Sequence, residues 1–345
     1  MDAVFLNNQA NADLVSIDVP ERKVYKAAGL AMFVMAMGHL LSRVLLFFIA
    51  QALASSSISA VAYDITIDII FSVLAQIVFC VVAPFLVYKF YLGRSTRQII
   101  SDSHFNNKAS VPTLLISVLI GIAGIFLSIV ISLFVTMILM LFGFNFGSGA
   151  TAMPEQFNIG LFFVSLFLIM VLPSICEEFA MRGLFLTAMK SMYVNVVFLI
   201  IMGLSFGLFH QNVRQFVQTA VAGGIMAFVV VKSGSIWPAV IIHAVNNGLA
   251  VVMDYAQTYG WGGGFMDRMF ALIASGGFFS MLFVGALAVG VIVPSCFLIA
   301  KEGKKRGGAM VTKRLYKPSL KESSFLIGAL VLTVLSTIMT IAFGM

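Results

Sequence analysis

Apolar positions along the chain form long continuous runs instead of short alternating stretches. The runs cover residues 28–53, 67–92, 113–143, 158–189, 193–212, 215–232, 236–254, 269–300 and 323–344. A helix needs about 20 apolar residues to cross a bilayer, so the pattern predicts an all-α polytopic membrane protein with about eight to nine transmembrane helices. A β-barrel is excluded, because lipid-facing strands alternate apolar and polar residues and these runs do not.

The composition agrees with a membrane protein. Of the 345 residues, 61% are hydrophobic and 10% are charged, and the mean hydropathy is +1.05. Ordinary soluble domains are about 25% charged, so this composition excludes a soluble enzyme, a disordered chain and a disulfide scaffold. Cys80, Cys176 and Cys296 lie in apolar runs without CxxC spacing, which predicts buried free thiols.

The basic residues indicate how the chain is oriented. The net charge is +7, which by itself suggests nucleic-acid binding, but the Lys and Arg residues fall in loops. With nine spans, seventeen of the 21 lie on the side of the N-terminus and only Arg214 and Arg268 lie on the other side. The positive-inside rule therefore predicts a cytoplasmic N-terminus and an outer C-terminus. Loop 301–322 is expected to lie against lipid headgroups, so the bilayer is the expected partner and nucleic acid is not.

Ionisable and strongly polar side chains inside the apolar runs are the candidate functional residues, because each costs several kcal/mol at bilayer depth. They are His39 and Arg43 in the first run, Glu177, Glu178 and Arg182 in the fourth, His210 in the fifth, and His243, Asn246 and Asn247 in the seventh.

The spacing of the fourth run predicts one ion pair and one free carboxylate. Glu178 and Arg182 are four residues apart, the favourable orientation for a pair on one helix face. Glu177 points about 100° away from Glu178 and is left to act as a general base. The alternative is that these residues only hold helices together.

The seventh run presents two possible hydrogen-bond donors on one face. His243 and Asn247 are four residues apart, so an imidazole and an amide point to the same place and can donate to an oxyanion. His210 lies on another helix, four residues after Phe206. At 1.5 Å per residue, Glu177, His210 and His243 differ in depth by about 13 Å, so a common site requires a tilt, shifted helix ends or a kink at Pro173.

Three motifs together resemble a known family. Glu177 to Arg182 resembles the EExxxR motif, Phe206 to His210 the FxxxH motif, and His243 to Asn247 the HxxxN motif. The chain is thereby similar to the CPBP family, the CAAX proteases and bacteriocin-processing enzymes also called Abi proteins. The resemblance covers residues 155–255, the predicted CPBP-like catalytic core. The apolar runs and charges place a cytoplasmic segment at 1–27, three helices in 28–143, and two helices with the basic cytoplasmic loop in 256–345.

The resemblance implies an intramembrane endopeptidase that needs no metal or cofactor and cleaves a membrane-associated or lipid-modified peptide or protein. It implies that Glu177 is the general base, that His210 orients or activates the water, and that His243 and Asn247 form the oxyanion hole. Glu178 and Arg182, with Phe206 as support, would hold the site in register. Such chains without a soluble domain are mostly bacterial, so a bacterial cell membrane is expected.

Four other interpretations remain open. Glu177, His210 and His243 have the ligand types of a catalytic zinc site, although HExxH is absent. Cys176 is a possible nucleophile. The chain can also be a non-catalytic scaffold or immunity protein of the same fold, or a transporter that uses the carboxylates as a proton relay. Ala220 and Gly224 form a small-xxx-small pair that can pack helices within one chain or between two.

Overall fold

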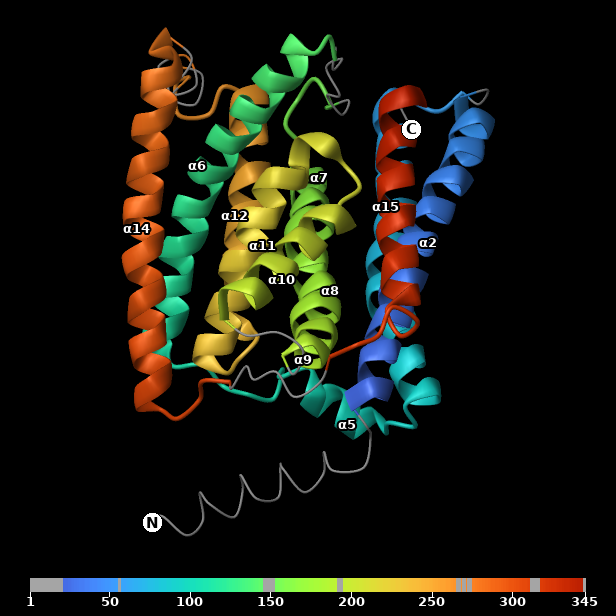
Figure 1. Cartoon of the computed structure of the whole chain (residues 1–345). Coiled ribbons are helices and arrows are strands. Elements are labelled where there is room, and N and C mark those ends of the chain that lie inside the picture. Colours follow the sequence, from blue (N-terminus) through green and yellow to red (C-terminus); the bar gives the residue numbers. More distant parts are fainter. Residues whose placement is uncertain are drawn as a thin grey trace.

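The computed structural model describes residues 21–54, 57–144, 153–190, 195–264, 268, 271, 275–310 and 317–343 (Figure 1). These residues form helices and connecting turns, without strands. Seven of the described helices are long and apolar enough to cross a membrane, and two shorter apolar helices cover Val196–Phe209 and Ser324–Ile338. The prediction of an all-α polytopic membrane protein is therefore confirmed.

The first two long helices pack against each other. Helix α2 covers Glu21–Ala54. The second helix runs without interruption as α3 (Ala60–Ser72), η1 (Val73–Val82), α4 (Ala83–Leu86) and η2 (Val87–Tyr91), where η denotes π-helical turns.

The short helix α5 (Thr96–Asp102) starts in a capping box at Ser95, and α6 covers Val111–Leu141.

The fourth long helix carries the first motif and contains two π-helical segments. It consists of α7 (Ile159–Ser165), η3 (Leu166–Val171), α8 (Leu172–Glu178), η4 (Phe179–Phe185) and α9 (Leu186–Met189). Pro173 is the second residue after η3, and wide π turns accommodate local interruptions of the hydrogen-bond ladder. The helix therefore continues through Pro173.

Helices α10 (Asn195–Phe209) and α11 (Val213–Ser233) form a tight hairpin, followed by α12 (Trp237–Thr258). A Cβ atom placed on Gly203 would lie 2.5 Å from the carbonyl oxygen of Ala220, and one on Gly207 2.6 Å from that of Phe216. Small residues are required for this approach. The Ala220–Gly224 pair thus packs α10 against α11 within one chain.

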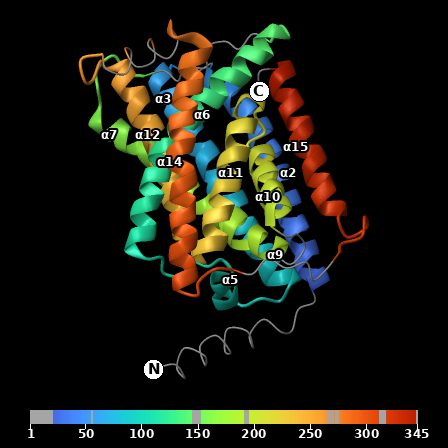
Figure 2. The ribbon, with the colours of Figure 1, turned by 60° about the vertical axis from the view of Figure 1, so that its left-hand side comes forward.

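Two further helices flank the bundle. Helix α14 (Gly277–Lys305) packs on α6, and α15 (Ser324–Phe343) packs on α2 (Figures 1 and 2). Helix α14 extends five residues beyond the apolar run, which was predicted to end at 300. These last residues are mostly charged, so the apolar pattern does not include them. At the start of α15, Glu322 forms an ion pair with Arg22 and Ser323 shares a hydrogen bond with Tyr25.

The last residue of α5 and the loop after it contact the ends of two helices that carry the motifs. Thr187 of α9 donates from its hydroxyl to the carbonyl of Asp102 (3.1 Å). Trp237, the first residue of α12, donates from Nε1 to the carbonyl of Phe105 (3.0 Å). The side chain of Asn107 donates to the carbonyl of Gly234 just before α12 (2.8 Å). The relative position of α9 and α12 is therefore set at this end of the bundle.

Candidate active site

Glu178 links two of the three motifs. Its Oε1 atom accepts from Arg182 Nη1 (2.8 Å), the predicted i, i+4 pair, and from His243 Nδ1 on α12 (2.9 Å). Glu178 and Arg182 are 0% exposed, and His243 is 6% exposed. A buried carboxylate requires such charged partners, so Glu178 joins the fourth helix to α12 through its side chain.

Phe206 lies at the centre of the polar cluster. The Arg182 guanidinium lies over its ring at 4.1 Å from the centroid, a cation–π contact. The ring also meets those of His210 and His243 nearly edge-on, with centroids 4.7 Å and 5.9 Å away. A large ring at this position therefore holds the cation and both imidazoles apart at fixed distances.

Glu177 points away from Glu178 and faces different helices, as the angle between adjacent helical residues predicts. Its Oε1 atom accepts from the side-chain amide of Gln76 in η1 (2.8 Å). Its Oε2 atom lies 4.0 Å from His210 Nε2, and it is buried without a hydrogen-bond partner among the described residues. One carboxylate oxygen is thus held in place while the other faces the imidazole.

His210 reaches Glu177 because α10 is short. The helix ends at Phe209, and His210 begins the turn that leads back into α11. His210 Nδ1 lies 2.9 Å from the carbonyl oxygen of Phe206. A carbonyl only accepts, so Nδ1 carries the proton. In the neutral imidazole this leaves the Nε2 lone pair directed toward Glu177. Glu177 and His210 therefore lie at the same depth in the bundle, although counting residues along the helices placed them at different depths.

Asn247 shares one face of α12 with His243, as predicted. Its Nδ2 atom donates to the carbonyl of Ile169 in η3 (3.0 Å), and its Oδ1 accepts from Asn246 Nδ2 (3.3 Å). A side-chain amide has two N–H groups, so the bond to Ile169 orients the amide and uses one of them.

His39 and Arg43 lie next to the site without entering its centre. The His39 ring packs on Phe209 with centroids 4.7 Å apart, and its Nε2 atom lies 3.9 Å from the thiol of Cys80. Arg43 Nη2 lies 3.5 Å from the carbonyl oxygen of His210, a weak contact that places α2 behind the turn. Cys80 and Cys176 are buried free thiols, as predicted, and Cys296 is a partly buried one.

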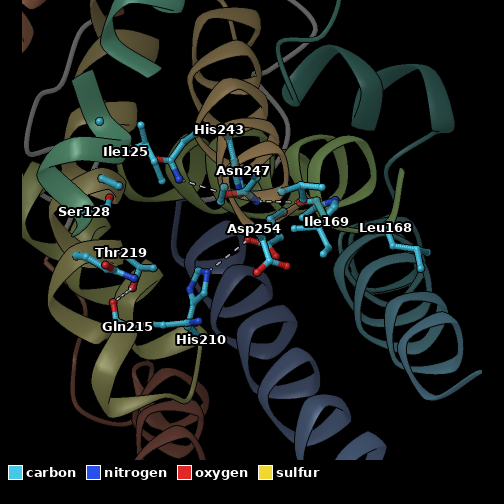
Figure 3. A pocket seen from close by; sticks show the side chains of 18 of the residues that line it. Ile125, Ser128, Leu168, Ile169, His210, Gln215, Thr219, His243, Asn247 and Asp254 are labelled. Atoms are coloured by element: carbon cyan, nitrogen blue, oxygen red, sulfur yellow. Dashed lines mark hydrogen bonds and ion pairs between the residues drawn. The ribbon is translucent and has the colours of Figure 1, made fainter. Parts of the chain in front are cut away.

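The site lies at the bottom of a large pocket. Its volume is about 820 Å³, and Gln76, Glu177, His210, His243 and Asn247 are among the residues that line it. Figure 3 shows His243 on α12 and His210 in the turn after α10 approaching the pocket from different sides, with Asn247 beside His243. Residues from all three motifs therefore line one large pocket within the bundle.

Gln76 is the site residue that the sequence analysis missed. It is 8% exposed and comes from the second long helix, about 100 positions before Glu177. The available signal is a lone amide in the apolar run 67–92, where only Asp68 and Lys89 are also strongly polar. A neutral amide costs less free energy at bilayer depth than a charged group, so it is a weaker signal of function, and none of the three motifs includes Gln76.

The zinc alternative requires three ligands around one point. In the part of the chain that the structure describes, no group of three His, Cys, Asp or Glu side chains is arranged to hold a metal ion. His243 turns its Nδ1 atom to Glu178, whereas His210 faces Glu177.

Comparison with known proteins identifies the motif-bearing segment. Residues 159–249 match the model of a family described as type II CAAX prenyl endopeptidase Rce1-like. The matched residues include all three motifs and lie within the predicted core, so the resemblance to CAAX proteases is confirmed for this segment. No curated protein and no solved structure matches the chain.

Proposed function

We propose that this chain, whose residues 159–249 are those of a CAAX-protease family, is an intramembrane endopeptidase that hydrolyses its substrate with a water activated by Glu177. The observation that carries the proposal is the pair of acceptors formed by Glu177 Oε2 and His210 Nε2, 4.0 Å apart at the bottom of a pocket. That separation is too long for a direct hydrogen bond and suits a bridging water.

A water between these two atoms donates one hydrogen to the carboxylate and one to the imidazole. Each acceptor group is oriented by a second hydrogen bond: Gln76 donates to Glu177 Oε1, and His210 Nδ1 donates to the carbonyl of Phe206. The lone pair of the water is then directed into the pocket, toward a bound peptide carbonyl. Attack transfers the water proton to Glu177, which passes it to the leaving amine.

The negative charge on the tetrahedral intermediate requires donors on the other side of the carbonyl. Asn247 supplies its second amide N–H. The Nδ1 proton of His243 is committed to Glu178, so the donor toward the substrate is Nε2–H, which exists together with Nδ1–H in the imidazolium form. With His243 charged, the carboxylates of Glu177 and Glu178 are balanced by Arg182 and His243, and the buried cluster is neutral.

The substrate class follows from the location of the pocket. The walls are mostly apolar and lie within membrane-spanning helices, so the peptide segment enters from the membrane or its surface. A lipid-modified peptide fits this setting, because its lipid chain can remain among the apolar helix faces.

The test uses the purified full chain in detergent with a panel of quenched fluorogenic peptides, with and without a farnesylated cysteine. Wild-type cleavage is expected to vanish in Glu177→Gln, which keeps the shape of the side chain and loses the base. Glu155→Gln is the matched control, because Glu155 is exposed in a loop outside the pocket. Each reaction is repeated with a strong chelator.

The outcomes separate the alternatives. Cleavage that persists in Glu177→Gln would remove Glu177 from the mechanism. Cleavage that is lost with the chelator and restored by zinc would favour a zinc protease. A wild-type chain that cleaves no peptide of the panel would favour the non-catalytic scaffold or immunity protein.

A further inference from the structure

The pocket has a closed end and an open end. At the closed end lie Glu177, Phe206 and His243, which are all buried. At the other end the wall is formed by the exposed residues Asp68 and Asp254. His243 and Asp254 are eleven residues apart on α12, which corresponds to about 16 Å along the helix. The pocket therefore leads from the site toward the end of α12 at Thr258.

The opposite end of α12 packs against the loop after α5. Trp237, six residues before His243, donates to the carbonyl of Phe105 in the loop after α5. The residues directly below the site on the fourth helix, such as Met181 and Leu184, are 0% and 1% exposed. The site is therefore shielded from the end of the bundle at which α12 begins.

The basic residues lie at that shielded end. Fifteen described Lys and Arg residues fall in segments 22–26, 89–108 and 301–306, at 190 and 232, and in 317–321. Three contacts hold these segments at one end of the bundle: the ion pair between Arg22 and Glu322, the bond from Met310 N to Val231 O (2.7 Å), and the bond from Asn107 to Gly234.

The open end has the opposite charge. Its described charged residues include Asp64, Asp68, Glu155 and Asp254, against Arg214 and Arg268. Glu155 belongs to this end because its neighbour Pro154 accepts a hydrogen bond from Tyr259, just after α12 (2.9 Å). In Figures 1 and 2, the end of α6 and the start of α14 lie at this end, far from α5.

We propose that the pocket opens on the non-cytoplasmic face of the membrane, so that the site takes a peptide segment from the outer surface or the outer half of the bilayer. The charge asymmetry carries this inference: helix ends rich in Lys and Arg remain in the cytoplasm, and the pocket opens at the other ends. That the occupant is a peptide substrate rests on the function proposed above, whereas the direction of the opening does not.

The experiment measures from which side the pocket is reached. Cells that express the full chain are treated with a membrane-impermeant maleimide before and after permeabilisation, and mass-tagged protein is quantified. Asp254→Cys probes the pocket mouth. Glu155→Cys probes the same face outside the pocket, and Lys304→Cys probes the basic end. Wild type supplies the background from its own cysteines, of which Cys80 and Cys176 are 0% and 5% exposed and Cys296 is partly buried.

We expect Asp254→Cys and Glu155→Cys to be labelled in intact cells, and Lys304→Cys to be labelled only after permeabilisation. The reverse pattern would overturn the proposal. So would labelling of Glu155→Cys in intact cells while Asp254→Cys stays unlabelled in both conditions, because the mouth would then be closed. Labelling does not depend on catalysis, so failure here is distinct from failure of the proposed proteolysis.

Discussion

The amide of Gln76 donates to the carboxylate of Glu177 at 2.8 Å, although 101 positions separate them in the sequence. Gln76 lies outside the segment that matches the CAAX-protease family. The bond fixes one carboxylate oxygen and leaves the other toward His210. The first helices of the chain therefore take part in the candidate site through a neutral side chain.

Gln76→Met is expected to lower kcat while KM stays near the wild-type value. Methionine keeps the length of the side chain and removes the donor, so the carboxylate loses its orientation but the pocket keeps its shape. Hydrogen bonds to charged groups contribute about 1.5–3 kcal/mol, so the loss in kcat should be at least about tenfold. Steady-state kinetics on the best peptide of the panel measures it.

Cys80→Ala is the control for this variant. Cys80 lies one turn further along η1, is fully buried, and its thiol lies 3.9 Å from His39 Nε2. Both variants disturb the same helix, so a general packing defect would lower kcat equally in the two. Equal losses would contradict a positioning role for Gln76.

Asn247→Ala should reduce kcat by about 100- to 1,000-fold, the usual cost of removing one oxyanion donor. Asn246→Ala serves as the comparison, because Asn246 lines the same pocket and its Nδ2 donates to Asn247 Oδ1, so its removal leaves the N–H groups of Asn247 in place. Its loss should be much smaller. If the two variants have the same rate, Asn247 does not stabilise the transition state.

Arg182→Ala should destabilise the fold by about 3–5 kcal/mol, because Glu178 would remain buried without its main cation. Glu178 and Arg182 are both 0% exposed, so water cannot replace the lost partner. Thermal unfolding in detergent measures the loss, with the exposed Arg97→Ala as the control. An unchanged Tm would show that His243 alone compensates Glu178.

Gly203→Ala should destabilise the hairpin of α10 and α11 by about 1–3 kcal/mol, because the added methyl group meets the Ala220 carbonyl at 2.5 Å. Gly290→Ala, with no atom within 4 Å of the new group, should instead stabilise its helix by up to about 1 kcal/mol. A lower Tm for Gly203→Ala and a higher Tm for Gly290→Ala, each relative to wild type, would confirm the close approach. Equal shifts in Tm would contradict it.

Stability should fall between pH 7 and pH 4 because of His104, in the loop after α5. Burial, and secondarily Lys190, lowers the pKa of His104 from its ordinary 6.5 to about 4. The ring binds Thr187 and Asn107. In this pH range the unfolded chain takes up a proton that the folded chain does not, which favours unfolding; below pH 4 both are protonated and the loss is complete.

His104→Asn removes the titrating ring, and asparagine tolerates the positive φ of 59° at this position. The variant is expected to have a lower Tm at pH 7, where the ring makes its two contacts, and a shallower fall in Tm toward pH 4. Scanning fluorimetry in detergent at several pH values gives both curves. Parallel curves would show that His104 does not titrate in this range.

The sequence by itself determined the helices and the faces of single helices. A backbone in lipid must satisfy its own polar groups, so every long apolar run had to become a helix. The i, i+4 spacing then put Glu178 with Arg182, and His243 with Asn247, whatever the rest of the chain does. The three motifs supplied the family resemblance.

Only the tertiary structure decided which helices face one another. Apolar side chains cover nearly all faces of these helices, so periodicity does not specify the rotation or the depth of a helix in its bundle. The contact of Gln76 with Glu177, the end of α10 that brings His210 to the same depth, and the direction in which the pocket opens all depend on that packing. Close approaches between helices, such as that of Gly203 to Ala220, determine how the helices pack.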